Sequence, residues 1–227
     1  MDRPKICVVI TAKDSERAVK AIKKVLPHDP DLIEIRFDYM ENIGEIKKIR
    51  EATDIPLIAT NHIREQGGLW AGSEMKRIDL LMSACEEGFE YVDLELSTDY
   101  IKNISDKFKN LGSKLIISYH DFDSTPRSNE LYGIMQKELD AGADICKIIG
   151  MAKEIGDALT YLRFILENPD VNLVCFGMND AGLISRIFSP LFGGKYTYAS
   201  TEAGEESALG QISISKLNII YEILGVR

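Results

Sequence analysis

The sequence contains few cysteines and no long apolar run. Its four cysteines form no CxxC pair and no spacing typical of metal ligands: Cys7, Cys85, Cys146 and Cys175. This pattern argues against a disulfide framework or a cysteine metal centre, and free thiols in apolar segments behave as small hydrophobes. No stretch approaches the ~18 consecutive apolar residues of a membrane span, and the charged start lacks the apolar core of a secretory signal. We therefore expect a cytoplasmic protein with no membrane partner.

Positive charge is also scarce in this chain. The 27 lysines and arginines are outnumbered by 36 aspartates and glutamates, which gives a net charge of -9. Such a balance disfavours nucleic acid or an anionic membrane surface as the main partner. The 227 residues are 45% apolar and contain no linker or low-complexity tract, so the chain can bury a large core. We expect residues 1–227 to form a single domain.

Short apolar, β-branched segments recur along the chain and predict strands. They occupy residues 6–12, 32–38, 57–62, 91–97, 114–120, 144–150, 172–178 and 195–200. Charged, amphipathic segments predict helices at 14–26, 73–87, 128–141, 152–167 and 212–224. Repeating units of roughly 23 to 35 residues are typical of βα repeats, and eight of them predict an α/β fold, the (β/α)8 TIM barrel.

The alternation of polar residues favours this barrel over an open, doubly wound sheet. In segment 32–38 the charged residues Glu34, Arg36 and Asp38 share one face, while apolar residues share the other. Helices cover the outside of a parallel sheet, so these charges are expected to point into a barrel lumen. Further polar residues alternate in the same way in later strands: Asp93, Glu95, Ser118, His120 and Lys147. The three charges of segment 32–38 either neutralise one another or contact a substrate, and both interpretations are compatible.

Lys147 lies in the middle of the predicted strand 144–150, where an ammonium group is normally excluded. Burial disfavours the charged form, and a drop of ~3 units from the ordinary lysine pKa of about 10.4 would leave a nucleophilic amine. His120 ends the preceding strand, so the sequence predicts a Schiff-base lysine beside an acid or base. The alternatives are a structural ion pair of Lys147 with Asp93 or Glu95, and a hydrogen-bonded core histidine at position 120.

Other candidates are weaker when each is taken alone. Arg186 follows the seventh predicted strand and fits either a ligand clamp or a solvated helix arginine. The segment 200–211 is rich in small residues and glutamate, which suits either a loop that closes over a ligand or an ordinary exposed loop. His28 lies in a proline-flanked turn, which indicates a surface residue. His62 closes the third predicted strand and is assigned neither to the site nor to its rim.

Several motifs occur in order at the expected strand ends. They are Glu-Ile-Arg-Phe-Asp at 34–38, Ser-Tyr-His-Asp-Phe at 118–122, Ala-Asp-Ile-Cys-Lys-Ile at 143–148, the segment 182–186, and Ser-Ala-Leu-Gly-Gln at 207–211. Together they span almost the whole chain, which thereby resembles the type I 3-dehydroquinate dehydratase family. The resemblance implies a (β/α)8 barrel that converts 3-dehydroquinate to 3-dehydroshikimate and water in the shikimate pathway, as a homodimer. It implies no metal and no organic cofactor.

The resemblance also implies roles for individual residues. Lys147 matches the Schiff-base lysine and His120 matches the general acid and base. The positions that hold the substrate match five residues: Glu34, Arg36, Arg186, Ser207 and Gln211. An iminium on Lys147 acidifies the neighbouring carbon, and one histidine can then move the proton from carbon to the departing hydroxyl.

The sequence departs from the family pattern near the third strand. His62 stands where an arginine is usual, and Gln66 fits the position just before the Gly-Gly pair. Whether Arg64 replaces the missing arginine is left open by the sequence. Leu209 also replaces a common proline in the last loop.

Two alternative functions are compatible with a barrel lysine. A class I aldolase would also form a Schiff base, but acidic residues follow the last strand at Glu202, Glu205 and Glu206 and would repel a substrate phosphate. A non-catalytic barrel could bind an acidic metabolite through Arg36 and Arg186, but this reading gives Lys147 no purpose.

Overall fold

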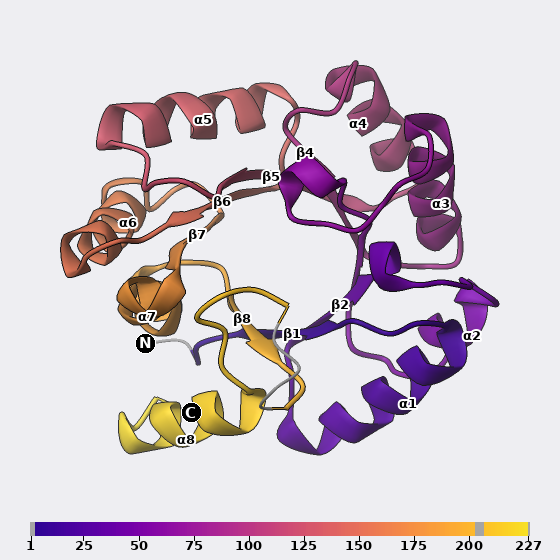
Figure 1. Ribbon diagram of the computed structural model, residues 1–227, viewed down its shortest axis with the longest axis horizontal. Coiled ribbons are helices and arrows are strands. Elements are labelled where there is room, and N and C mark those ends of the chain that lie inside the picture. Colours follow the sequence, from indigo (N-terminus) through magenta and orange to yellow (C-terminus); the bar gives the residue numbers. More distant parts are fainter. Residues whose placement is uncertain (1–2, 203–206, 227) are drawn as a thin grey trace.

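The computed structural model describes residues 3–202 and 207–226, which form one eight-stranded parallel sheet. The strand order is β7-β6-β5-β4-β3-β2-β1-β8, so the first strand joins the last and the sheet curls into a barrel surrounded by helices (Figure 1). At the remaining gap, the backbone N–H of Lys195 donates a hydrogen bond of 2.7 Å to the carbonyl of Leu173. The predicted (β/α)8 barrel is therefore confirmed.

All eight predicted strands are present, although the first four end two residues earlier than predicted. Their bounds are β1 (Ile6–Ile10), β2 (Leu32–Arg36), β3 (Leu57–Thr60), β4 (Tyr91–Glu95), β5 (Lys114–Asp121), β6 (Ile145–Met151), β7 (Leu173–Met178) and β8 (Thr197–Ser200). After β2, the chain turns into a short 3-10 helix, η2 (Phe37–Tyr39), instead of continuing as a strand. This turn removes Asp38 from the predicted strand but keeps it buried.

Helices follow the strands and cover the outside of the sheet (Figure 1). They are α1 (Ser15–Val25), α2 (Ile46–Arg50), α3 (Glu74–Glu86), α4 (Ile101–Asn110), α5 (Ser128–Asp140), α6 (Ile155–Glu167), α7 (Asn179–Phe188) and α8 (Ile214–Ile223). The sequence analysis named no helix at α2, α4 or α7, and α2 spans only 5 residues. Within the described residues, no helix is long and apolar enough to cross a membrane.

Side-chain alternation divides the core into an outer and an inner layer. On β6, Cys146 and Ile148 pack outward against α5 and α6, whereas Ile145 and Ile149 join an apolar cluster inside the barrel. Lys147 lies between these last two residues and shares their inward direction. The lumen is thus apolar at its base and carries a group of charged side chains toward the carboxyl ends of the strands.

One carboxyl group lies outside the lumen and is buried between a helix and the sheet. Glu138, on α5, is 0% exposed, and neither of its oxygens has a hydrogen-bond partner among the described residues. Burial raises the pKa of Glu138 well above its ordinary value, and the nearby Cys146 thiol and the positive charge of Lys147 offset only part of this effect. Glu138 is therefore held in its neutral form by the fold.

A buried neutral carboxyl makes stability depend on pH in a defined direction. Because the folded-state pKa of Glu138 is raised, folding takes up a proton, and this contribution is lost as pH rises through the folded pKa. We expect Glu138→Met to raise the free energy of unfolding by about 1–3 kcal/mol at pH values above that pKa. It should also flatten the decline of stability with rising pH. Urea unfolding at several pH values measures both effects.

The matched control is Glu167→Met, because Glu167 is an exposed carboxylate at the end of α6. This variant should leave the pH dependence of unfolding unchanged. A Glu138→Met protein with the wild-type pH profile would show that Glu138 is ionised in the folded state.

Candidate active site

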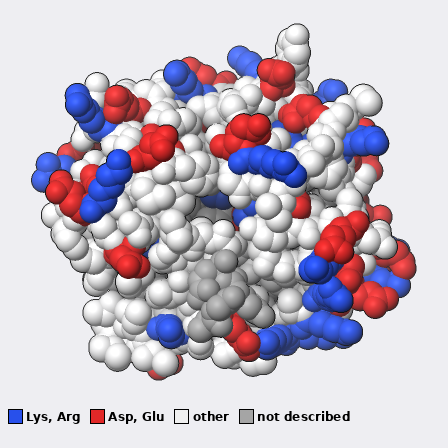
Figure 2. All heavy atoms as spheres, viewed as in Figure 1, with Lys and Arg blue, Asp and Glu red and all other residues white. Residues whose placement is uncertain are grey.

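A pocket at the carboxyl ends of the strands contains most of the predicted site residues. Figure 2 shows basic side chains inside a hollow at the centre of this face of the molecule. The pocket and the solvent-open space at its mouth together hold about 550 Å³. Its lining includes residues from β2, β5, β6, α7, the segment after β3 and the segment before α8: Glu34, Arg36, His62, Gln66, His120, Lys147, Arg186, Ser207 and Gln211. Seventeen residues line it in all, so sequence positions far apart meet at one site.

Lys147 is 6% exposed and ion-paired with two carboxylates. Its Nζ atom donates a hydrogen bond of 2.7 Å to Asp93 Oδ2, and it lies 3.7 Å from Glu34 Oε1. The ammonium also lies over the ring of Tyr198, 4.8 Å from its centroid. The tyrosine hydroxyl donates a 3.2 Å hydrogen bond to Glu34, so these groups form one connected network.

The neutral amine expected from the sequence is not what this network favours. Burial alone lowers the pKa of Lys147, as expected, but attraction to Asp93 and Glu34 outweighs it, and the net shift is upward. The same pairing holds the pKa of Asp93 well below its ordinary value against the opposing effect of burial. The prediction of a lowered Lys147 pKa is therefore wrong for the free protein, because the sequence did not show that two carboxylates face the amine.

His120 lies on the strand next to Lys147 and lines the same pocket. Ser118 is paired with Lys147 in the β5–β6 register, so His120 lies two residues further toward the open end. Its Nδ1 atom is buried and has no hydrogen-bond partner among the described residues. Burial lowers the pKa of His120 well below its ordinary value, and the positive charge of Lys147 lowers it further. A neutral imidazole of this kind is able to accept a proton.

Arg186 is a buried guanidinium without a carboxylate partner among the described residues. It is 2% exposed, its Nε atom has no hydrogen-bond partner in this part of the chain, and one terminal nitrogen donates a 3.3 Å bond to the Leu209 carbonyl. The guanidinium lies 4.4 Å from the centroid of the Phe176 ring. Burial lowers the pKa of Arg186 to about 10. The arginine is therefore not the solvated helix residue that the sequence left open, and it is well suited to bind an anion.

The other predicted substrate contacts have partners within the protein. Arg36 forms two hydrogen bonds with Asp38, of 2.8 and 2.7 Å, which neutralise its charge. Glu34 accepts a 2.9 Å bond from Thr60. The Gln211 side-chain oxygen accepts bonds from the backbone and hydroxyl of Ser207, at 2.7 and 3.1 Å. All these residues except Asp38 and Thr60 line the pocket.

The segment after β3, residues 62–66, departs from the family pattern, and the structure shows where its side chains lie. His62 and Gln66 line the pocket, whereas Arg64 is exposed and is not among the lining residues. The Gln66 side-chain oxygen accepts a 3.3 Å bond from the backbone N–H of His120. Arg64 therefore does not replace an arginine at position 62 in this conformation. Of the loop 200–211, residues 203–206, including Glu205 and Glu206, lie outside the described residues.

Several residues of the site have a larger role in the structure than the sequence suggests. Asp93 was considered only as a structural ion-pair partner of Lys147, and neither Tyr198 nor Phe176 was singled out. Tyr196, just before β8, and Tyr198, on β8, are two residues apart, and both rings lie inside the barrel. The alternation of these tyrosines could have indicated that both face the barrel interior. The same pattern is equally typical of two core residues, so it did not single out Tyr198.

Comparison with known proteins resolves the family. The Type I 3-dehydroquinase family model matches residues 6–227. The chain belongs to the type I 3-dehydroquinase family. A 3-dehydroquinate dehydratase of Methanococcus vannielii is 34% identical over 221 residues, which cover 96% of this chain and 99% of that protein. Another from Methanobrevibacter smithii is 37% identical, with 96% of this chain and 95% of that protein covered.

Solved structures agree with the family assignment. The type I 3-dehydroquinate dehydratase of Clostridium difficile, crystallised with covalently modified comenic acid, superposes with a TM-score of 0.88 at 30% identity and covers 99% of this chain and 93% of its own. The enzyme of Geobacillus kaustophilus gives a TM-score of 0.90 at 28% identity, with 98% and 91% covered. A 3-hexulose-6-phosphate synthase, at 14% identity and a TM-score of 0.59, shares the barrel fold alone. The roles of individual residues in this type I 3-dehydroquinase stay predictions.

Proposed function

We propose that this chain is a 3-dehydroquinate dehydratase that removes water from 3-dehydroquinate through a Schiff base on Lys147. Family membership supports the reaction, and the curated relatives carry this name. The observation that carries the mechanism is the pocket in which an amine, a neutral imidazole and a buried guanidinium converge, on Lys147, His120 and Arg186. An amine can attack a ketone, an imidazole can move a proton, and a guanidinium can hold a carboxylate.

The proposed reaction begins with Lys147. After loss of its proton, the amine attacks the C3 carbonyl carbon of the substrate, water leaves, and a protonated imine forms. The positive iminium remains beside Asp93 and Glu34, which already neutralise the ammonium. Because the nitrogen is positive both as the ammonium and as the iminium, the two carboxylates stabilise the charge before and after this step.

His120 then acts as the acid and base. The neutral imidazole takes the proton from C2, and the electron pair moves into the iminium to give an enamine. The resulting imidazolium protonates the C1 hydroxyl, which leaves as water while the electron pair returns to form the new C1–C2 double bond. Water finally hydrolyses the product imine and releases 3-dehydroshikimate and the free amine. Each proton taken up by His120 is thus returned within the same cycle.

The remaining pocket residues are proposed to bind the substrate. Arg186 donates a forked pair of hydrogen bonds to the substrate carboxylate, since its guanidinium is buried and has no carboxylate partner among the described residues. Glu34, Arg36, Ser207 and Gln211 face the pocket with groups that can bind ring hydroxyls. The competing aldolase function lacks support from the described residues near β8, because Glu202 there pairs with Lys24 and offers no phosphate site.

We further propose a single catalytic domain that forms a homodimer in the cytoplasm. One sheet contains every described strand, and helices α6 and α8 expose apolar side chains such as Leu159 and Ile223, at 53% and 80%. Free thiols buried at four positions suit a reducing compartment. Sedimentation equilibrium would refute the dimer by giving the 25.4 kDa mass of one chain. Two separate unfolding transitions would argue against one domain, and cell fractionation tests the location.

The proposed mechanism predicts a covalent intermediate on Lys147. Protein incubated with 3-dehydroquinate and borohydride should gain a reduced adduct on the peptide that contains Lys147, detected by mass spectrometry. Lys147→Met should abolish the adduct, whereas Lys153→Met, which removes an exposed lysine nearby, should not. His120→Ala should still form the adduct but slow turnover by about 10²–10⁴.

Two results would contradict this mechanism. An adduct on another residue would remove Lys147 from its role. Turnover by His120→Ala at the wild-type rate would mean that another group moves the proton, even with the adduct on Lys147.

Another prediction concerns the buried arginine of the pocket, Arg186. Arg186→Met removes a buried charge that has no carboxylate partner among the described residues, so the free energy of unfolding of the free protein should rise by about 1–3 kcal/mol. The same change should raise KM by about 100-fold, because a charge-assisted contact to the carboxylate is lost. Arg186→Lys is the matched control, because it keeps the positive charge but cannot donate two parallel hydrogen bonds. Its KM should lie between those of the wild-type protein and Arg186→Met. A stable variant with unchanged KM would place the carboxylate elsewhere.

A further inference from the structure

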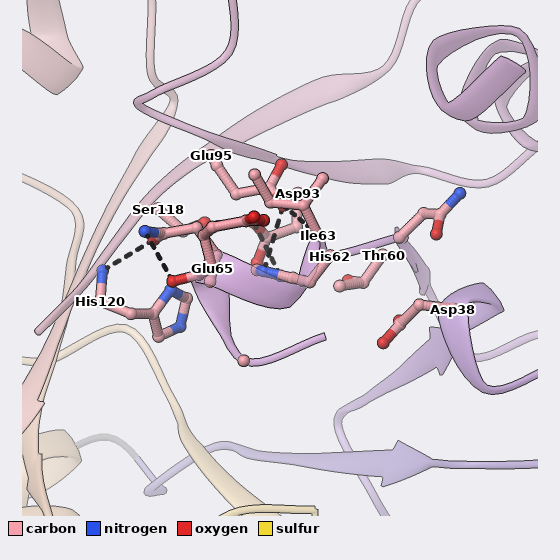
Figure 3. Close-up of polar contacts among 12 residues, drawn as sticks. Asp38, Thr60, His62, Ile63, Glu65, Asp93, Glu95, Ser118 and His120 are labelled. Carbon is pink, nitrogen blue, oxygen red and sulfur yellow. Dashed lines mark hydrogen bonds and ion pairs between the residues drawn. The ribbon is translucent and has the colours of Figure 1, made fainter. Parts of the chain in front are cut away.

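His62 occupies a buried position between the catalytic pocket and a pair of carboxylates. It follows β3, is 3% exposed, and lines the pocket. Its Nε2 atom lies 3.5 Å from Asp93 Oδ1, and its Nδ1 atom lies 3.6 Å from Glu95 Oε1 (Figure 3). The imidazole therefore has an acidic side chain near each nitrogen. It also meets the ring of His120 edge-on, with centroids 5.2 Å apart.

Asp93 connects His62 with the reactive amine. One oxygen, Oδ2, accepts the 2.7 Å bond from Lys147, while the other, Oδ1, accepts a 2.6 Å bond from Ser118 and faces His62. The carboxylate is therefore shared between an ammonium and an imidazole. Positive charge on either one weakens the hold of Asp93 on the other, because both compete for the same negative charge in a buried site.

Glu95, the other acidic neighbour of His62, already has a counter-ion. The guanidinium of Arg77, on α3, is 1% exposed, forms an ion pair with Glu95, and forms a second one with Glu74 at 2.7 Å. Glu95 therefore does not depend on a charge on His62 for its neutralisation. The carboxylate whose balance it changes is Asp93.

We propose that His62 is a positioning residue that controls, through Asp93, how readily Lys147 gives up its proton and forms an imine. When His62 carries a proton, Asp93 is divided between two cations and the ammonium of Lys147 is held less tightly. When His62 is neutral, Asp93 serves Lys147 alone and retains the proton on the amine. The inference rests on the proposed role of Lys147, and it adds a residue to which that mechanism assigns no part.

The other charged and titratable groups around His62 and Asp93 also affect the protonation of Lys147 and His120. From β2, Glu34 supports the ammonium, while Arg36 is neutralised by Asp38. From β5, His120 faces His62, and positive charge on Lys147 and His62 adds to burial in lowering the pKa of His120. A protonated His62 therefore favours both the free amine on Lys147 and the neutral base at His120. Tyr198, from β8, contributes its ring face and its bond to Glu34.

The test measures the rate of imine formation at Lys147 in the absence of the proposed substrate. Reductive methylation with formaldehyde and cyanoborohydride reports imine formation at each lysine, and peptide mass spectrometry gives the rate at Lys147 relative to the exposed Lys107. At pH values where His62 is protonated, His62→Gln should lower this relative rate by about tenfold, since one nearby charge is removed. His62→Arg, which keeps a permanent cation, should restore it. His28→Gln, which removes the partly exposed histidine near α1, is the matched control and should have no effect.

The pH profile separates this role from a merely structural one. In the wild-type protein, loss of the His62 proton tightens the hold on Lys147, so the logarithm of the rate should rise with pH less steeply than for one independent group. In His62→Gln the rise should have the full slope of a single titration. His62→Asn provides a second neutral variant if the glutamine variant does not fold.

Each result bears on the inference directly. A neutral variant that folds and keeps the wild-type rate and slope would overturn it, and so would a folded His62→Arg protein that behaves like His62→Gln. Failure of the proposed function looks different, because a protein that does not dehydrate 3-dehydroquinate would still show the same formaldehyde profile.

Discussion

The ion pair between Lys147 and Asp93 is the interaction on which the site depends. An ammonium buried inside a barrel is costly unless a carboxylate replaces the lost water, and Asp93 does so at 2.7 Å with Glu34 close by. The parallel register then fixes the geometry: Ser118 is paired with Lys147 on the neighbouring strand, and its hydroxyl bonds to Asp93. The amine is therefore held rigidly at the base of the pocket.

The basic residues of the pocket differ in whether a carboxylate of the protein neutralises them. Lys147 and Arg36 have carboxylate partners inside the protein, whereas Arg186 has none among the described residues and rests against an aromatic ring. A guanidinium in this condition lowers the stability of the free protein and is best stabilised by an anionic ligand. The net charge of -9 does not prevent this, because burial isolates the local site from distant surface charges.

The sequence was sufficient for the fold and for the grouping of the site residues. Alternation in the second strand placed Glu34 and Arg36 inside a barrel, and the strand ends placed His120 beside Lys147. What it could not supply was the charge state of the amine, because that depends on how close the carboxylates of Asp93 and Glu34 come to Lys147. Residues such as Tyr198 were missed for a related reason, since an aromatic residue on an inward face packs and binds equally well. Short helices were missed where, as in α2, one turn of residues gives little periodicity.

The most direct test of this account is a measurement of the Lys147 pKa in the free protein and in Asp93→Asn, by NMR titration of ¹⁵N-labelled lysine side chains. Attraction to the carboxylates outweighs burial, so the wild-type Lys147 should remain protonated above the ordinary lysine pKa of about 10.4. In Asp93→Asn burial remains while the main counter-charge is gone, so the pKa should fall below that of the wild-type protein. A Lys147 that is already neutral at pH values near 7 in the wild-type protein, or one whose pKa is unchanged in Asp93→Asn, would contradict the account.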